Sequence, residues 1–163
     1  MKETIEKLYA SFASLDAKGM AACYADDALF EDEAFSLRGR HAIGGMWSML
    51  LDAIRKRGRK DWKLEVRDIT DNSAHWEPTY RFSATGRLVH TVIDAEFEFD
   101  SQGLIKRQRD RFDFWRWSRQ ALGAPGLLLG WSGFLRGKVR RSAARQLDNY
   151  MKSYAPPERR VAP

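Results

Sequence analysis

The stretch Tyr24-Ala25-Asp26-Asp27-Ala28-Leu29-Phe30-Glu31-Asp32 carries more information about the fold than any other part of the chain. Its acid pair is expected to mark the turn between a helix end at residues 22–25 and a short strand at residues 28–32. Successive side chains of a strand point to opposite faces, so Phe30 and Asp32 share one face. If Phe30 points into the core, Asp32 does too, and a carboxylate in an apolar wall is either costly or functional.

Apolar residues at helical spacing predict the helices that surround this stretch. A first helix is expected from Ile5 to Leu15 and a third from Ile43 to Ile54, with residues 20–25 forming a short second helix and residues 33–38 a loop.

From Trp62 onward the hydrophobic period changes to two, which is typical of strands. The strands are expected over residues 62–66, 75–82, 89–99 and 104–115. Pro78 is expected to bend the second of them, because proline cannot donate to a sheet ladder. Helices followed by meandering strands indicate an α+β fold.

Three segments together resemble the NTF2-like superfamily, in its SnoaL-like and ketosteroid isomerase-related branch. They are the opening stretch with Leu37-Arg38-Gly39 after it, Val92-Ile93-Asp94, and Phe99-Asp100-Ser101-Gln102-Gly103-Leu104-Ile105. The resemblance covers residues 5–123. It implies a cone-shaped, curved mixed β-sheet wrapped around the N-terminal helices, as in cystatin-like folds, with a deep pocket.

The resemblance suggests a division of the chain into three parts. An NTF2-like domain is expected over residues 1–123. An apolar loop and an extra, basic amphipathic helix are expected over residues 124–154, packed on that domain. Residues 155–163 are expected to form a disordered tail.

Two aspartates are the candidate catalytic residues. The resemblance implies that Asp32 is a base that moves a proton at a carbon next to a carbonyl, since the aspartate ending the short strand does so in ketosteroid isomerases. Asp110 resembles the acid/base aspartate that SnoaL-like cyclases carry late in the sheet, and Gln108 shares its face. One ionised and one protonated carboxyl group would then form a pair. Alternatively, Asp32 caps a turn or pairs with Arg38 or Arg40, and Asp110 is satisfied by neighbouring polar groups.

Ketosteroid isomerases also stabilise an oxyanion with a tyrosine on the first helix and an aspartate on a long strand. A gapless alignment places Leu8 at the tyrosine position, and Tyr9 lies about 100° away around the helix. A second alignment, through Phe99-Asp100 and Gly103, places Ala95 at the strand position and Asp94 on the opposite face. We therefore expect both donors to be missing, which argues against steroid isomerisation.

Side chains on the inward faces are expected to bind a small hydrophobic ligand, although each aromatic residue among them is alternatively ordinary core. The candidate substrate-binding residues are Tyr24, Trp47, Trp76, Tyr80, Phe82, Phe97, Gln108 and Phe112. No histidine pair has metal-ligand spacing and the single cysteine, Cys23, is expected to be a buried apolar residue. We therefore expect no metal and no cofactor.

These features favour an isomerase-type or cyclase-type enzyme. It would act on a hydrophobic carbonyl-bearing or polycyclic small molecule by cofactor-free acid/base chemistry. The sequence leaves open whether the protein is catalytic at all. The alternative is a non-catalytic protein that binds a hydrophobic ligand in the same pocket.

Charge is distributed unevenly along the chain. Residues 1–100 carry 14 Lys and Arg against 18 Asp and Glu, whereas residues 101–163 carry 14 against 4. Such a basic third could meet nucleic acid, an anionic membrane or an acidic partner. However, no nucleic-acid-binding motif is present. We expect no nucleic-acid partner, and we expect the C-terminal helix to cover the domain rather than contact a membrane.

The outer sheet face mixes Val92 with charges of both signs, so we expect a homodimer through the sheet. The N-terminus lacks the apolar core of a signal peptide, and one cysteine cannot form an internal disulfide. A cytoplasmic location is therefore expected.

Overall fold

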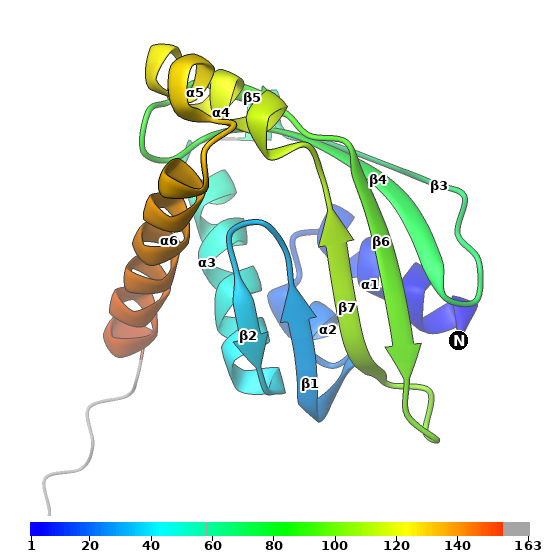
Figure 1. Cartoon of the computed structure of the whole chain (residues 1–163). Helices are drawn as coiled ribbons and strands as arrows, with labels where there is room; N and C mark the ends of the chain where they lie inside the picture. Colours follow the sequence, from blue (N-terminus) through cyan, green and yellow to red (C-terminus); the bar gives the residue numbers. More distant parts are fainter. Residues whose placement is uncertain (58, 155–163) are drawn as a thin grey trace, which may run out of the picture.

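A computed structural model describes residues 1–57 and 59–154 of the chain (Figure 1). The tail expected to be disordered, residues 155–163, lies outside the described residues. The α-helices are α1 (Lys2–Ala13), α2 (Ala17–Ala21), α3 (Arg40–Arg57), α4 (Phe114–Leu122), α5 (Ala124–Leu129) and α6 (Gly133–Tyr154), with a short 3₁₀ turn over Arg59–Asp61. The strands are β1 (Tyr24–Glu31), β2 (Ser36–Arg38), β3 (Lys63–Arg67), β4 (Ser73–Arg81), β5 (Leu88–His90), β6 (Ile93–Phe99) and β7 (Ile105–Arg111).

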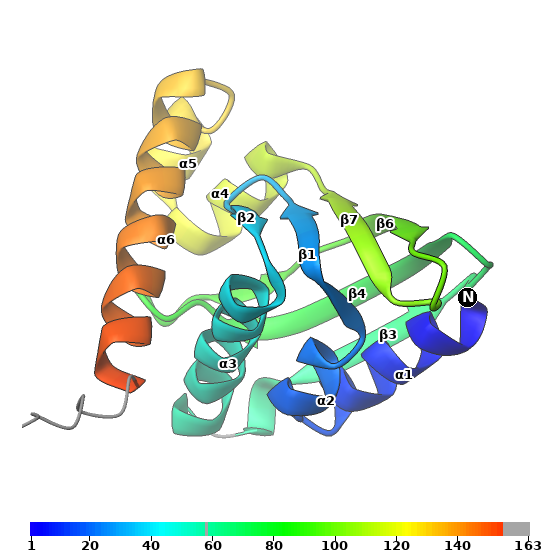
Figure 2. The same ribbon diagram turned by 90° about the horizontal axis from the view of Figure 1, so that it is seen from below.

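The strands form one mixed sheet in the order β2-β1-β7-β6-β4-β3, with β5 also paired to β4. Only the β1–β7 pair is parallel among the described strands. The sheet curves around α1, α2 and α3, as Figures 1 and 2 show from two sides. The α+β class with a curved mixed sheet around N-terminal helices is therefore confirmed.

The predicted alternation of β6 is confirmed. Ile93, Ala95 and Phe97 are buried against the helices, whereas Asp94 and Glu96 are exposed on the outer face. Because this alternation fixes the register, it also fixes which side chains of β7 can face the interior.

The opening stretch differs from the prediction in where its strand begins. β1 already starts at Tyr24, so the acid pair lies within the strand instead of in a turn. Asp26 and Asp27 are both exposed, and the pairing with β7 shifts between Tyr24 and Leu29 to accommodate them. Arg40 secures this irregularity, because its guanidinium lies 3.0 Å from the Asp26 carboxylate and donates to the main-chain oxygen of Tyr24 at 2.6 Å. The loop expected over residues 33–38 contains the short strand β2.

The strand expected over residues 89–99 is divided into β5 and β6. The division follows the partner strand: residues 73–76 of β4 pair with β6, and residues 79–81 pair with β5. Pro78, which lacks an N–H, lies where the neighbour of β4 changes.

The last strand is shorter than predicted. β7 ends at Arg111, and Asp113 instead caps α4 by accepting a hydrogen bond from the Arg116 N–H at 3.0 Å. The pairing of β6 with β7 also shifts between Glu98 and Phe99. The resulting bulge exposes Lys106 and lets Ile105 and Gln108 both face the core.

The C-terminal segment contains two helices where a loop and one helix were expected, because residues 124–129 form α5. The amphipathic helix is present as α6 and packs against α3. A Cβ atom at Gly45 would lie 2.0 Å from the Met151 Sδ, so glycine permits this close approach. The Tyr150 hydroxyl donates to Asp52 at 2.6 Å, and Leu147 is buried in the main core.

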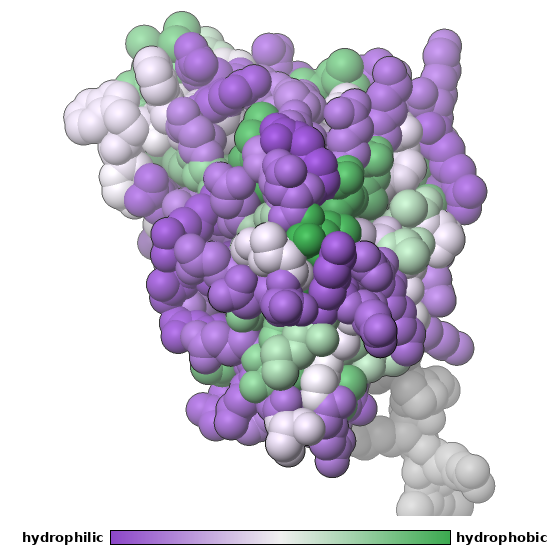
Figure 3. Space-filling view, turned by 90° about the vertical axis from the view of Figure 1, so that its right-hand side faces the viewer, coloured by the Kyte–Doolittle hydropathy of each residue, from purple (hydrophilic) through white to green (hydrophobic). Residues whose placement is uncertain are grey.

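In residues 1–57 and 59–154, no helix is both long and apolar enough to cross a membrane. The side of the molecule turned to the viewer in Figure 3 is mostly hydrophilic, with small hydrophobic areas between the polar side chains.

Candidate functional site

A chain of hydrogen bonds crosses the interior of the cone and ends at Asp110. The Gln108 Nε2 donates to the Asp110 Oδ1 at 2.8 Å, and both residues are almost fully buried on β7. The Tyr24 hydroxyl donates to the Gln108 Oε1 at 2.5 Å and accepts from the Trp47 Nε1 at 3.2 Å. These hydrogen bonds link the strands β7 and β1 and the helix α3. They pass through four of the predicted site residues, namely Asp110, Gln108, Tyr24 and Trp47.

Asp110 has an environment that favours its protonated form. Burial raises the pKa of Asp110 well above its usual range, and the negative charge of Asp32 adds to this, while the Gln108 hydrogen bond opposes it. In the described part of the chain, no cation forms an ion pair with Asp110. A protonated Asp110 carries an O–H that can donate a hydrogen bond.

Asp32 lies one residue past β1, at the start of a tight turn. Its Oδ1 accepts hydrogen bonds from the N–H groups of Ala34 at 2.6 Å and Phe35 at 2.5 Å. This is the turn-capping arrangement considered from the sequence. Arg40, one of the two arginines suggested as partners of Asp32, binds Asp26 instead.

The Asp32 carboxyl group nevertheless titrates near neutrality. Burial raises the pKa of Asp32 to about 6, even though the two N–H donors of the turn lower it. Asp32 is therefore largely ionised at pH 7, whereas the environment of Asp110 favours a proton. Two carboxyl groups with different protonation states are the usual basis of paired acid and base catalysis.

Tyr80 lies on the same face of β4 as the buried Trp76. Burial raises the pKa of Tyr80, and the charge of Asp32 adds to that rise, as it does for Asp110. The Tyr80 hydroxyl accepts a hydrogen bond from the Trp117 Nε1 of α4 at 3.0 Å.

Tyr9 lies in the interior of the fold. Its side chain is buried, and burial followed by the charge of Asp110 raises the pKa of Tyr9. Its hydroxyl finds no hydrogen-bond partner within residues 1–57 and 59–154. The apolar stripe of α1 is broad enough to bury Leu8 and Tyr9 together, so a one-residue offset in an alignment does not turn the tyrosine outward. Asp94 does face outward as expected, where it binds His75.

The other predicted binding residues fall into two packed groups. Trp76 and Phe97 lie in the main core, and the Trp76 ring centroid is 5.9 Å from that of Tyr9. The Trp76 Nε1 is also buried without a partner in the described chain. Phe82 and Phe112 pack instead with Trp117 in a second cluster beneath α4.

Two surface clefts of about 400 Å³ each border some of these residues, since Phe112 and Trp117 line one cleft and Phe97 lines the other. One is lined by residues of the β5–β6 connection, the end of β7 and α4, and the other by the outer faces of β6 and β7. Neither cleft is lined by Asp32 or Asp110. The deep pocket implied by the resemblance stays a prediction.

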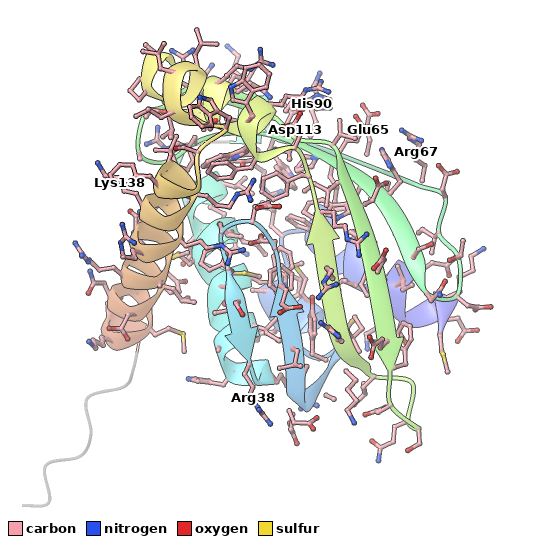
Figure 4. All side chains as sticks on the ribbon, in the orientation of Figure 1. Arg38, Glu65, Arg67, His90, Asp113 and Lys138 are labelled. Carbon is pink, nitrogen blue, oxygen red and sulfur yellow. The ribbon has the colours of Figure 1, made fainter. Side chains whose placement is uncertain are left out.

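A separate polar cluster occupies the outer face of the sheet around Glu77. Its carboxylate binds His75 and His90 at 2.9 Å each and Arg67 at 3.0 Å. These contacts, first that of His75 and then that of Arg67, lower the pKa of Glu77 to about 2. Figure 4 shows Arg67 and His90 among the side chains of the strands that carry this cluster.

The comparisons with known proteins agree with the arrangement of helices and sheet. A model of the SnoaL-like domain matches residues 5–108. No curated protein matches the sequence.

Several solved structures resemble the chain. A putative polyketide cyclase from Silicibacter sp. TM1040 has a TM-score of 0.54 at 18% identity, over 73% of this chain and 93% of its own. An epoxide hydrolase described as LEH-like, from M. tuberculosis, has a TM-score of 0.50 at 21% identity, over 77% and 90% of the two chains. A bacterial protein with a cystatin-like fold from Silicibacter pomeroyi has a TM-score of 0.54 at 13% identity, over 95% and 89%. At these identities the likeness shows the fold alone.

Proposed function

The chain belongs to the SnoaL-like domain family, and from this premise we propose that it is a cofactor-free acid/base enzyme of the isomerase or cyclase type. Its substrate would be a hydrophobic small molecule with a carbonyl group or fused rings. The observation that carries the proposal is a pair of carboxyl groups with raised pKa values, since the half-buried Asp32 has a pKa of about 6 and the buried Asp110 a pKa well above its usual range.

In this proposal Asp32 removes a proton from a carbon beside the carbonyl, and Asp110 donates a hydrogen bond to the oxygen on which negative charge develops. The unpartnered hydroxyl of Tyr9 provides a further donor for that oxygen. Gln108 is a positioning residue, because its amide donates to the Asp110 carboxyl group and accepts from the Tyr24 hydroxyl.

The second candidate function is ligand binding without turnover. The observation favouring it is the turn cap, since the Asp32 Oδ1 is already bound by two N–H groups. Buried donors at Tyr9 and Trp76 would then hold a ligand oxygen with no base beside it.

Exchange of α-protons for deuterium in a panel of hydrophobic cyclic ketones distinguishes the two functions. We expect exchange to be catalysed by the unchanged protein and to fall about 100-fold or more in Asp32→Asn, which keeps the cap acceptor but removes the base. Asp27→Asn is the matched control, because Asp27 is exposed on the preceding strand. Its exchange rate should equal that of the unchanged protein.

A thermal-shift measurement with the same ketones separates the remaining outcomes, because a ligand that binds the folded state raises its stability. Stabilisation without exchange in either protein would favour the binding function. Exchange that persists in Asp32→Asn would remove Asp32 from the catalytic role.

A further inference from the structure

Among residues 1–57 and 59–154, large exposed hydrophobic side chains gather on α5, on the turn that follows it and at the start of α6. We define the α5 tip as the side chains of Leu127, Leu128, Leu129, Trp131 and Phe134. Their exposed fractions are 52%, 67%, 44%, 75% and 69%. Five large apolar side chains within eight residues of sequence are far more than the isolated exposed residues of an ordinary surface.

Close packing and hydrogen bonds hold the α5 tip in place. The inner side of α5 lies against α4 so closely that a Cβ atom at Gly126 would meet the main-chain oxygen of Ser118 at 1.9 Å. The Trp115 Nε1 donates to the Leu127 oxygen at 3.3 Å, and the Trp131 Nε1 donates to the Leu128 oxygen at 3.0 Å. Since glycine and main-chain atoms fill the inner side, the large side chains of the tip are left on the outer side.

The stretch of sequence that contains the tip carries basic residues but no acidic ones. Residues 114–147 carry seven Arg and Lys and no Asp or Glu. The guanidinium of Arg119 lies over the Trp115 ring at 4.4 Å, and that of Arg136 lies over the Phe114 ring at 5.2 Å. Figure 4 shows Lys138 projecting outward from α6, below α5.

We propose that the α5 tip docks the protein reversibly on the surface of an anionic lipid bilayer. Trp, Phe and Leu side chains enter the boundary between headgroups and acyl chains, while Arg and Lys side chains meet the negative headgroups. This combination matches both the apolar character of the tip and the absence of acidic residues from residues 114–147, although Arg136 is also paired with Glu33 at 3.1 Å. It differs from the membrane contact considered from the sequence, because the apolar stripe of α6 packs toward α3 and the contact is made by α5, the turn after it and the first residues of α6.

The docked orientation would bring the candidate site close to the lipid. The helix α4 that supports the tip contacts Tyr80 through Trp117, and α6 contacts the Asp32 turn through Arg140. Hydrophobic small molecules dissolve in membranes, so the site would face the phase in which its ligands collect. The docking inference itself does not depend on the proposed function.

Flotation of the full chain with lipid vesicles tests the inference. We expect binding to vesicles made of equal parts phosphatidylcholine and phosphatidylglycerol, and much weaker binding to phosphatidylcholine alone. Trp131→Ser combined with Phe134→Ser should lower binding by roughly ten-fold or more. Arg119→Gln and Lys138→Gln should each lower it about five-fold, and salt should weaken binding of the unchanged protein.

Matched controls lie on other parts of the surface. Leu29→Ser replaces an exposed leucine of β1, and Lys63→Gln with Lys106→Gln removes two exposed charges from β3 and β7. These variants should bind as the unchanged protein does. Trp131→Phe should keep most of the binding but lose most of the blue shift of tryptophan emission on adding vesicles.

Three results would overturn the inference: no vesicle binding, equal binding to neutral and anionic vesicles, or equal losses in tip and control variants. A further contradicting result is a dimer in sedimentation that becomes a monomer in Trp131→Ser with Phe134→Ser, without vesicle binding. That result would assign the tip to a second copy of the chain.

Discussion

The two faces of the sheet shift the pKa of a carboxyl group in opposite directions. On the inner face Asp110 is bonded to the neutral amide of Gln108, and its pKa is raised well above the usual range. On the outer face Glu77 is surrounded by His75, His90 and Arg67, and its pKa is lowered to about 2. Because neighbouring residues of a strand alternate between these faces, the face on which a carboxyl group lies decides which of the two environments it meets.

The contrast also suggests where the protein tolerates change. Outer ion pairs are hydrated and screened, so each contributes little to stability. Inner polar groups have no water to replace a lost partner, so their hydrogen bonds are expensive to break.

The largest effect is expected from breaking the inner chain of hydrogen bonds. Gln108→Leu leaves Asp110 and Tyr24 without their shared partner and should lower the free energy of unfolding by ~2–4 kcal/mol. Arg111→Leu is the outer counterpart, because it removes the exposed ion pair with Glu96, and should cost less than ~1 kcal/mol. Urea unfolding of both variants measures the difference. Equal losses would mean that the two faces do not differ in this respect.

A smaller effect is expected in the pH dependence of stability. The pKa of Asp32 is raised from 3.8 to about 6 on folding, so the folded state holds the proton more tightly than the unfolded state. Stability therefore falls as the pH rises from about 4 to about 6. Asp32→Asn should remove this loss, gaining ~1–2 kcal/mol relative to the unchanged protein across that range.

Glu77 should show the opposite sign. Its lowered pKa contributes stability that is present above about pH 4.5 and is lost as the pH falls toward about 2. The advantage of the unchanged protein over Glu77→Gln should therefore shrink in acid. Thermal unfolding at a series of pH values checks both variants. The contrast between the two carboxyl groups would be contradicted if the stability differences of Asp32→Asn and Glu77→Gln from the unchanged protein had the same sign.

The smallest effect is expected at the two tyrosines of the inner face. The Tyr24 hydroxyl both donates and accepts a hydrogen bond, so Tyr24→Phe should lower the free energy of unfolding by ~1–2 kcal/mol. Tyr9 buries a hydroxyl that has no partner in the described chain, so Tyr9→Phe should be neutral or stabilising by up to ~1 kcal/mol. If Tyr9→Phe destabilises as much as Tyr24→Phe, the Tyr9 hydroxyl has a partner in solution. Catalytic exchange should nevertheless fall in Tyr9→Phe under the proposed function.

Alternation made the inward position of Gln108, Asp110 and Ala95 predictable, because side-chain direction depends only on local strand geometry. The bulge at Lys106 was not predictable in the same way, since it arises from pairing between β6 and β7. The turn cap of Asp32 was one of two alternatives, and only the main-chain path through Phe35 selects it.

The helix α5 was missed for a related reason. Its glycines and proline are typical of a loop, yet Pro125 occupies the first turn, where its missing N–H costs nothing. Close packing of Gly126 on α4 then favours the helix, and the local sequence pattern of residues 124–129 does not reveal that contact. The homodimer, the cytoplasmic location and the absence of a cofactor stay predictions.

The contacts of Arg140 have a consequence for the order in which the protein is completed during synthesis. This residue donates from α6 to the main-chain oxygens of Asp32 and Glu33, more than 100 positions earlier, and Arg136 binds the Glu33 carboxylate at 3.1 Å. The turn that holds the candidate base therefore receives its outer support only from a helix made more than 100 residues later, so a chain that stopped before α6 would have the base without that support.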